Sequence, residues 1–211
     1  MKDSAINPAD PKRSIISWSG GKDSCFALMK AMQQGYTPVA LLNVMNESGK
    51  RSRSHGLSHS ILQQQANVLN VTLHTIESSW EAYESNFVQG ISELKKQYNA
   101  SDIIFGDIDL QQHRDWEEKV AAAAGLRAVL PLWLANRKSL VLEMISQGME
   151  AMIISCNNVM GQASLGRIIT VELVNTLENM GIDPCGENGE YHTVVLNCPL
   201  YSTPLSVIPT Q

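Results

Sequence analysis

The sequence lacks an uninterrupted apolar segment of the roughly 20 residues that a membrane-spanning helix requires. It also lacks an excess of basic charge: 16 Lys and Arg oppose 21 Asp and Glu, and the net charge of -5 gives no strong nucleic-acid signal. Its four cysteines include no CxxC pair, so the usual zinc and dithiol motifs are absent. Residues 1–13 are polar and lack the apolar core of a signal peptide, and we expect a flexible tail on a cytoplasmic protein without membrane contact.

Short apolar runs alternate with amphipathic segments along the chain. The expected strands are residues 15–18, 39–44, 71–76, 103–105, 128–130 and 151–155, each apolar throughout, as in parallel strands buried on both faces. Expected helices lie between them, and four of these end at glycines: Gly35, Gly125, Gly148 and Gly181. This alternation predicts an α/β fold, a parallel sheet with helices on both faces, whose ligands bind beyond the carboxyl ends of the strands.

One expected helix carries an aromatic stripe. Trp80, Tyr83 and Phe87 recur at helical spacing, which favours burial in the core over a base-stacking surface. Ser78 and Glu81 have the spacing of a capping box that would start this helix.

The most informative motif lies between the first expected strand and the first expected helix. It is a glycine turn with a lysine and hydroxyls: Ser19, Gly20, Gly21, Lys22, Asp23 and Ser24. At a helix N-terminus the free backbone N–H groups and the helix dipole attract an anion, and glycines let the chain approach it closely. The motif is not the Walker pattern, which places four residues between its first glycine and Gly-Lys-Ser/Thr. It predicts a phosphate-binding loop.

A second motif, residues 183–193, concentrates titratable groups near two glycines. Glu187, Glu190 and His192 could converge there on one point. The same stretch is also compatible with a polar surface turn, because Asn-Gly followed by the β-prone residues 191–196 is typical of a hairpin.

Together the two motifs resemble the ATP pyrophosphatases, and within that superfamily the diphthine–ammonia ligase family. The resemblance covers residues 15–201 and includes landmarks at residues 46–49, 55–56, 65–66, 106–108, 131–133 and 165–167. The segment 106–117 departs from the family's usual Gly-Ala-Ile and Tyr-Gln-Arg pattern and is similar to short bacterial members. This departure falls where the family's acceptor substrate is expected to bind.

The resemblance implies a Rossmann-like domain of the adenine nucleotide alpha hydrolase type and an ATP-dependent amide ligase that uses Mg²⁺. An acceptor carboxylate on elongation factor 2, or on a small molecule, would be adenylated and then attacked by ammonia from ammonium. The implied catalytic residues are Lys22, Asp23, Glu187, Glu190 and His192. Residues 19–24 and Asn43 would hold ATP, with Asp23 also linked to the metal. Acceptor contacts are expected from Gly106, Asp107, Gly186, Asn188 and Thr193.

The chain is expected to divide into an ATP-binding domain, residues 14–132, and a smaller C-terminal α/β part, residues 133–211, that binds the acceptor. Two other functions stay open: a tRNA-modifying sulfurtransferase that uses Cys156 and Cys185, and an ATP-binding sensor without chemistry. His55 belongs to a family landmark, whereas His59, His74 and His113 receive no role. The oligomeric state is also open, a homo-oligomer included.

Overall fold

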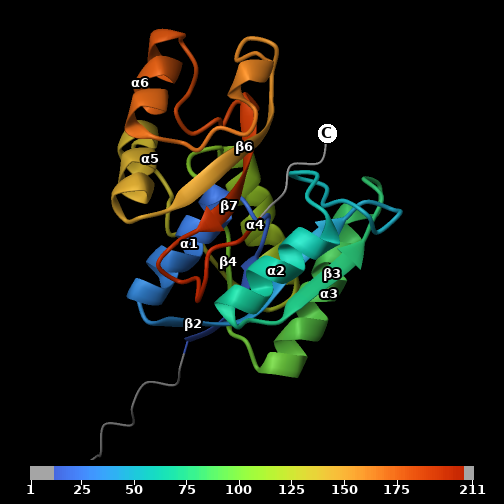
Figure 1. The fold of residues 1–211 in the computed structure, drawn as a ribbon. Helices are drawn as coiled ribbons and strands as arrows, with labels where there is room; N and C mark the ends of the chain where they lie inside the picture. Colours follow the sequence, from blue (N-terminus) through green and yellow to red (C-terminus); the bar gives the residue numbers. More distant parts are fainter. Residues whose placement is uncertain (1–11, 207–211) are drawn as a thin grey trace, which may run out of the picture.

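The computed structural model describes residues 12–206, and every structural statement below concerns this range. Its strands and helices alternate in the first two thirds of the chain (Figure 1). In chain order the elements are β1 (Lys12–Ser17), α1 (Lys22–Gln33), β2 (Tyr36–Met45), α2 (His59–Leu69), β3 (Leu73–Glu77), α3 (Tyr83–Tyr98), β4 (Asp102–Ile104), α4 (Gln111–Ala123), β5 (Arg127–Val129), α5 (Arg137–Ser146), β6 (Glu150–Cys156), η1 (Gln162–Ser164), α6 (Val171–Asn179) and β7 (Tyr191–Asn197).

The main sheet has five parallel strands in the order β3-β2-β1-β4-β5. The chain builds outward from β1 to β3, then crosses to β4 on the other side of β1. In such sheets the crevice for ligands opens where the strand order reverses, beyond the carboxyl ends of the strands. The segments that follow β1 and β4 meet at this crevice and carry the phosphate-loop motif and Gly106-Asp107.

Helices cover both faces of this sheet, which confirms the predicted fold class. Alternate residues of the central strands face opposite ways, so that Ile16 and Ile104 join the core around α1. Ile15 and Ile103 join a second core with Phe87 of α3. The helices of residues 12–206 do not combine the length and apolar character that a membrane crossing requires.

The C-terminal elements form a smaller unit in which β6 and β7 pair antiparallel. Our expectation that residues 151–155 form a strand of the parallel sheet was wrong. Ala151 and Ile153 are buried, whereas Met152 and Ile154 are only partly buried, so one face of β6 carries most of the packing. Figure 1 shows α5, α6 and β6 grouped at one end of the molecule, with β7 running back beside α1.

One local prediction fails at the N-terminus. Lys12 and Arg13 were expected in the tail, yet they open β1 and pair with Tyr36 and Thr37 of β2. Residues 1–11 of that tail lie outside the described residues. Elsewhere the four glycines predicted to end helices all have positive φ, as helix-ending residues in the left-handed region do.

The helix with the aromatic stripe starts later than the sequence suggested. α3 begins at Tyr83 after Ala82, and Ser78 bonds the Ser79 carbonyl and the Asn86 amide without capping the helix. Trp80 therefore precedes the helix and is 70% exposed, so its assignment to the core was wrong. The guanidinium of Arg53 lies over its ring at 4.8 Å.

Candidate active site

The phosphate-loop motif connects the end of β1 to the start of α1, as predicted. Gly20 has a φ of +81°, a conformation that glycine adopts without strain. At Gly21 a Cβ would lie 2.2 Å from Cε1 of the His55 ring. The two glycines thus turn the chain and let His55 pack directly against the loop.

Side-chain hydroxyls contact the amides that would hold a phosphate. The Gly21 amide donates to Oγ of Ser19 at 3.2 Å, and the Lys22 amide donates to Oγ1 of Thr193 at 3.1 Å. The hydroxyls of Ser19 and Ser24 lie 2.9 Å apart. A bound phosphate would take these donors over by rotation of the hydroxyls, with Thr193 of β7 already at the loop.

Lys22 and Asp23 form an ion pair at the start of α1. Lys22 Nζ lies 2.8 and 2.9 Å from the two Asp23 carboxylate oxygens and also donates to the Cys185 carbonyl. Burial alone would lower the pKa of Lys22, but the Asp23 charge raises it, so the lysine stays charged. The pair therefore links the phosphate loop to the second motif.

The segment that follows β4 forms another wall of the site and packs against the phosphate loop. A Cβ on Gly106 would lie 2.8 Å from the backbone nitrogen of Ser24, so this glycine packs against the phosphate loop itself. Asp107 Oδ1 accepts a hydrogen bond from His113 Nδ1 at 2.6 Å, and the buried Glu117 bonds the same carboxylate. Three titratable side chains of segment 106–117 therefore line the cavity: Asp107, His113 and Glu117.

The second motif closes the site from the C-terminal side. The Glu187 amide donates to Oδ2 of Asp183 at 3.1 Å, and Arg137 bonds both Asp183 and Asp109. This network fixes the Glu187 backbone. Burial, followed by the charge of Asp23, raises the pKa of Glu187 to about 7.

Glu190 takes a different part from the one we expected. Its carboxylate accepts hydrogen bonds from the backbone amides of Asp183 and Asn188, within its own loop. Neither Glu190 nor Asn188 lines the cavity, so the convergence predicted for Glu187, Glu190 and His192 is only partial. Glu190 braces the loop that presents Glu187.

These walls enclose a cavity of about 510 Å³. The predicted residues that line it are Ser19, Lys22, Asp23, Ser24, Asn43, Gly106, Asp107, Gly186, Glu187, His192 and Thr193. Gly20 and Gly21 lie in the loop behind this surface. The sequence thus indicated most of the residues that the fold brings together.

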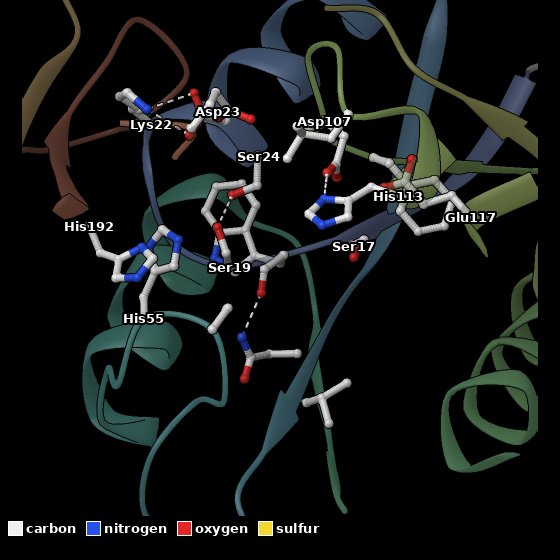
Figure 2. Close-up of a pocket in the computed structure, with 18 of the residues that line it drawn as sticks. Ser17, Ser19, Lys22, Asp23, Ser24, His55, Asp107, His113, Glu117 and His192 are labelled. Carbon is white, nitrogen blue, oxygen red and sulfur yellow. Dashed lines mark hydrogen bonds and ion pairs between the residues drawn. The ribbon is translucent and has the colours of Figure 1, made fainter. Parts of the chain in front are cut away.

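Three cavity residues had received no role from the sequence: His55, His113 and Glu117. His55 packs against His192 with ring centroids 4.7 Å apart, on the side of the cavity opposite Asp107, His113 and Glu117 (Figure 2). Nδ1 of His55 donates to the Thr193 carbonyl at 2.9 Å, and burial lowers the pKa of His55 to about 4. The family landmark His55-Gly56 was a signal in the sequence that could have identified His55. Nothing in the local sequence pattern marked His113 or Glu117.

Asn43 lies at the carboxyl end of β2, on the cavity wall. Its Nδ2 donates to the Trp18 carbonyl at 2.6 Å, and its buried Oδ1 has no hydrogen-bond partner among residues 12–206. The side chain therefore ties β2 to the start of the phosphate loop.

The residues fit magnesium only in company with a nucleotide. Within residues 12–206, groups of three or more His, Cys, Asp or Glu side chains that could hold a metal are absent. Mg²⁺ is commonly bound through one or two carboxylates together with substrate phosphates. Asp23, on the cavity wall beside the phosphate loop, suits such a shared site.

Comparison with known families gives a match across nearly all of the chain. Residues 12–128 match the diphthamide synthase N-terminal domain, and residues 136–211 match the diphthamide synthase C-terminal domain. The chain belongs to the diphthamide synthase family. This confirms the resemblance drawn from the two motifs.

Curated relatives carry the name diphthine–ammonia ligase. The human relative is 29% identical, with 90% of this chain and 80% of that protein aligned, and the zebrafish relative is 27% identical, with 92% and 85% aligned. The fission yeast relative is 26% identical, and the chain spans only 34% of its length. A solved structure titled as a predicted subunit of a tRNA methyltransferase from Methanocaldococcus jannaschii, 15% identical over 89% of this chain, has a TM-score of 0.47, too distant to support a conclusion.

Proposed function

We propose that this protein is an ATP-dependent amide ligase that adenylates an acceptor carboxylate and then joins ammonia to it. The family and the ligase class are those of its curated relatives. The observation that carries the proposal is the cavity itself, in which the phosphate loop faces Glu187 and Asp107.

The reaction divides into two steps. An oxygen of the acceptor carboxylate attacks the α-phosphorus of ATP, the bond to the β-phosphate breaks, and pyrophosphate leaves toward the loop. Charge grows on the leaving group, where the amides of residues 20–22 and the charged Lys22 would stabilise it. Ammonia then attacks the acyl carbon, the bond to the AMP oxygen breaks, and the amide forms.

ATP with Mg²⁺ and the acceptor would bind to different parts of the cavity. Residues 19–24 would hold the phosphates, with Asp23 linked to Mg²⁺, and the backbone of β2 near Asn43 would receive the adenine. Bound magnesium would neutralise charge on the phosphates. The acceptor would bind between Asp107 and residues 186–193. These last residues belong to the C-terminal part, residues 133–211, which would bind the acceptor. We further propose a cytoplasmic location, in keeping with the four free cysteines.

A sulfurtransferase function is not favoured by the thiols. Burial raises the pKa of Cys185, whose Sγ donates to the Arg137 carbonyl. Cys156 is half-buried at the end of β6 and does not line the cavity. A reactive cysteine is normally a thiolate held in an electropositive site, and the raised pKa of Cys185 disfavours the thiolate.

The proposal predicts which products ATP gives. With Mg²⁺, ammonium and diphthine-bearing elongation factor 2, we expect AMP and pyrophosphate in amounts equal to the amide formed. Chromatography of the nucleotides and mass spectrometry of the acceptor measure both. AMP formed without dependence on this acceptor would direct the search to another carboxylate. ADP as the product would contradict the adenylating mechanism.

A further inference from the structure

Ammonium, the main form of ammonia at neutral pH, must lose two protons to become an amide nitrogen. The first is lost when ammonium becomes nucleophilic ammonia, and the second when the new C–N bond forms and AMP departs. This inference rests on the proposed function, and Glu187, which lines the cavity with a pKa raised to about 7, is one candidate acceptor. The site therefore needs a second proton acceptor near the acyl carbon.

His113 has the geometry of such an acceptor. Its ring lines the cavity and the side chain is 59% exposed, so a proton taken up there can pass on to water. Nδ1 is held by Asp107 at 2.6 Å, which leaves Nε2 as the nitrogen free to accept. A base oriented by a carboxylate through its other nitrogen is the arrangement used in catalytic triads.

Glu117 completes the arrangement from one turn further along α4. Glu117 is buried, with only 3% of its surface exposed. Burial, with the hydrogen bond to Asp107, raises the pKa of Glu117 to about 11. Glu117 is therefore a protonated acid that donates to Asp107 and holds it for His113.

We propose that His113, oriented by Asp107 and Glu117, is the general base that takes the proton from the attacking ammonia. The N–H bond breaks as the C–N bond forms, the proton moves to Nε2, and the electrons of the C–O bond leave with AMP.

The surroundings favour an imidazole that gains a proton during the reaction. Acidic groups from two parts of the chain act on it: Asp107 through its hydrogen bond and its charge, and Glu187 through its charge. Asp107 raises the pKa of His113 through their hydrogen bond. Across the cavity, burial together with the charge of Asp107 raises the pKa of Asp23 of α1.

The test separates the two steps in full-length His113→Ala enzyme. Acceptor-dependent exchange of pyrophosphate into ATP, measured without ammonium, reports adenylation and is expected to stay at the wild-type rate. Amide formation is expected to fall about 100-fold, as for the loss of a general base. Added imidazole should restore part of it, because the exposed site admits a free base, and sodium chloride at equal ionic strength should not. His59→Gln, an exposed histidine of α2, is the matched control.

Asp107→Asn provides a second readout. It should lower the pKa of His113 and move the corresponding limb of the pH profile of amide formation to lower pH. Normal amide formation by His113→Ala, or equal loss of exchange and amide formation without imidazole rescue, would overturn the role of His113. Wild-type enzyme that shows no acceptor-dependent exchange would instead refute the proposed function, and this inference with it.

Discussion

Replacement of Gly106 by alanine is expected to weaken ATP binding about 100-fold, and ATP turnover with it, while the protein stays folded. The added Cβ would lie 2.8 Å from the Ser24 nitrogen and 2.9 Å from the Asp23 carbonyl carbon. Both atoms belong to the backbone, so no rotamer change relieves the contact and the phosphate loop must shift. Isothermal titration with ATP and a melting curve measure the two effects.

Gly90→Ala is the matched control for this substitution. Gly90 lies inside α3, and its Cβ would meet side-chain methyls alone, the nearest of them a methyl of Ile76 at 3.3 Å. That methyl can yield, and alanine favours the helix by about 1 kcal/mol over glycine. We expect ATP binding to be unchanged. If Gly106→Ala and Gly90→Ala bound ATP with equal affinity, the close packing of Gly106 against the phosphate loop would not contribute to ATP binding.

Replacement of Glu187 by glutamine is expected to lower amide formation about 100-fold and to leave ATP binding unchanged. The carboxylate lines the cavity and its pKa of about 7 lets it accept a proton at neutral pH. The glutamine side chain keeps the shape of glutamate, but its amide group cannot accept a proton. Amide formation at saturating ATP, compared with the affinity for ATP, separates the two effects.

The pH dependence of amide formation provides a second test of the role of Glu187. Because burial raises the pKa of Glu187, the group is protonated below about 7 and active above it, so the wild-type rate should rise with pH through this region. Glu187→Gln should lose that ionisation. Glu118→Gln, whose exposed carboxylate pairs with Arg114 on the surface of α4, should retain the wild-type profile. Full amide formation by Glu187→Gln would remove the carboxylate from the mechanism.

The phosphate loop could be predicted because its chemistry is local. Glycines, a lysine and hydroxyls between an apolar strand and a helix need only the chain on either side to form an anion site. The fold class followed from the alternation of apolar runs. The presence of Glu187 and His192 at the cavity could be predicted for the same reason, since the residues around them already formed a dense polar segment.

The rest depended on contacts between distant segments. Asp107 and His113 are six residues apart, but their value as a pair depends on Gly106 packing against Ser24. A run such as residues 151–155 is apolar whether it joins a parallel sheet or pairs with β7, so the pattern alone did not reveal its partner. The position of Glu190 outside the cavity lining could not be predicted, because a carboxylate that bonds its own loop has the same sequence pattern as one that faces a substrate.

The account is tested most directly by the fate of an acceptor oxygen. Diphthine-bearing elongation factor 2 labelled with ¹⁸O in the acceptor carboxylate would be converted with ATP and ammonium, and the label followed by mass spectrometry. Attack on the α-phosphorus predicts that one labelled oxygen appears in the phosphate of AMP. Label in inorganic phosphate, with ADP as the other product, would contradict adenylation at this phosphate loop.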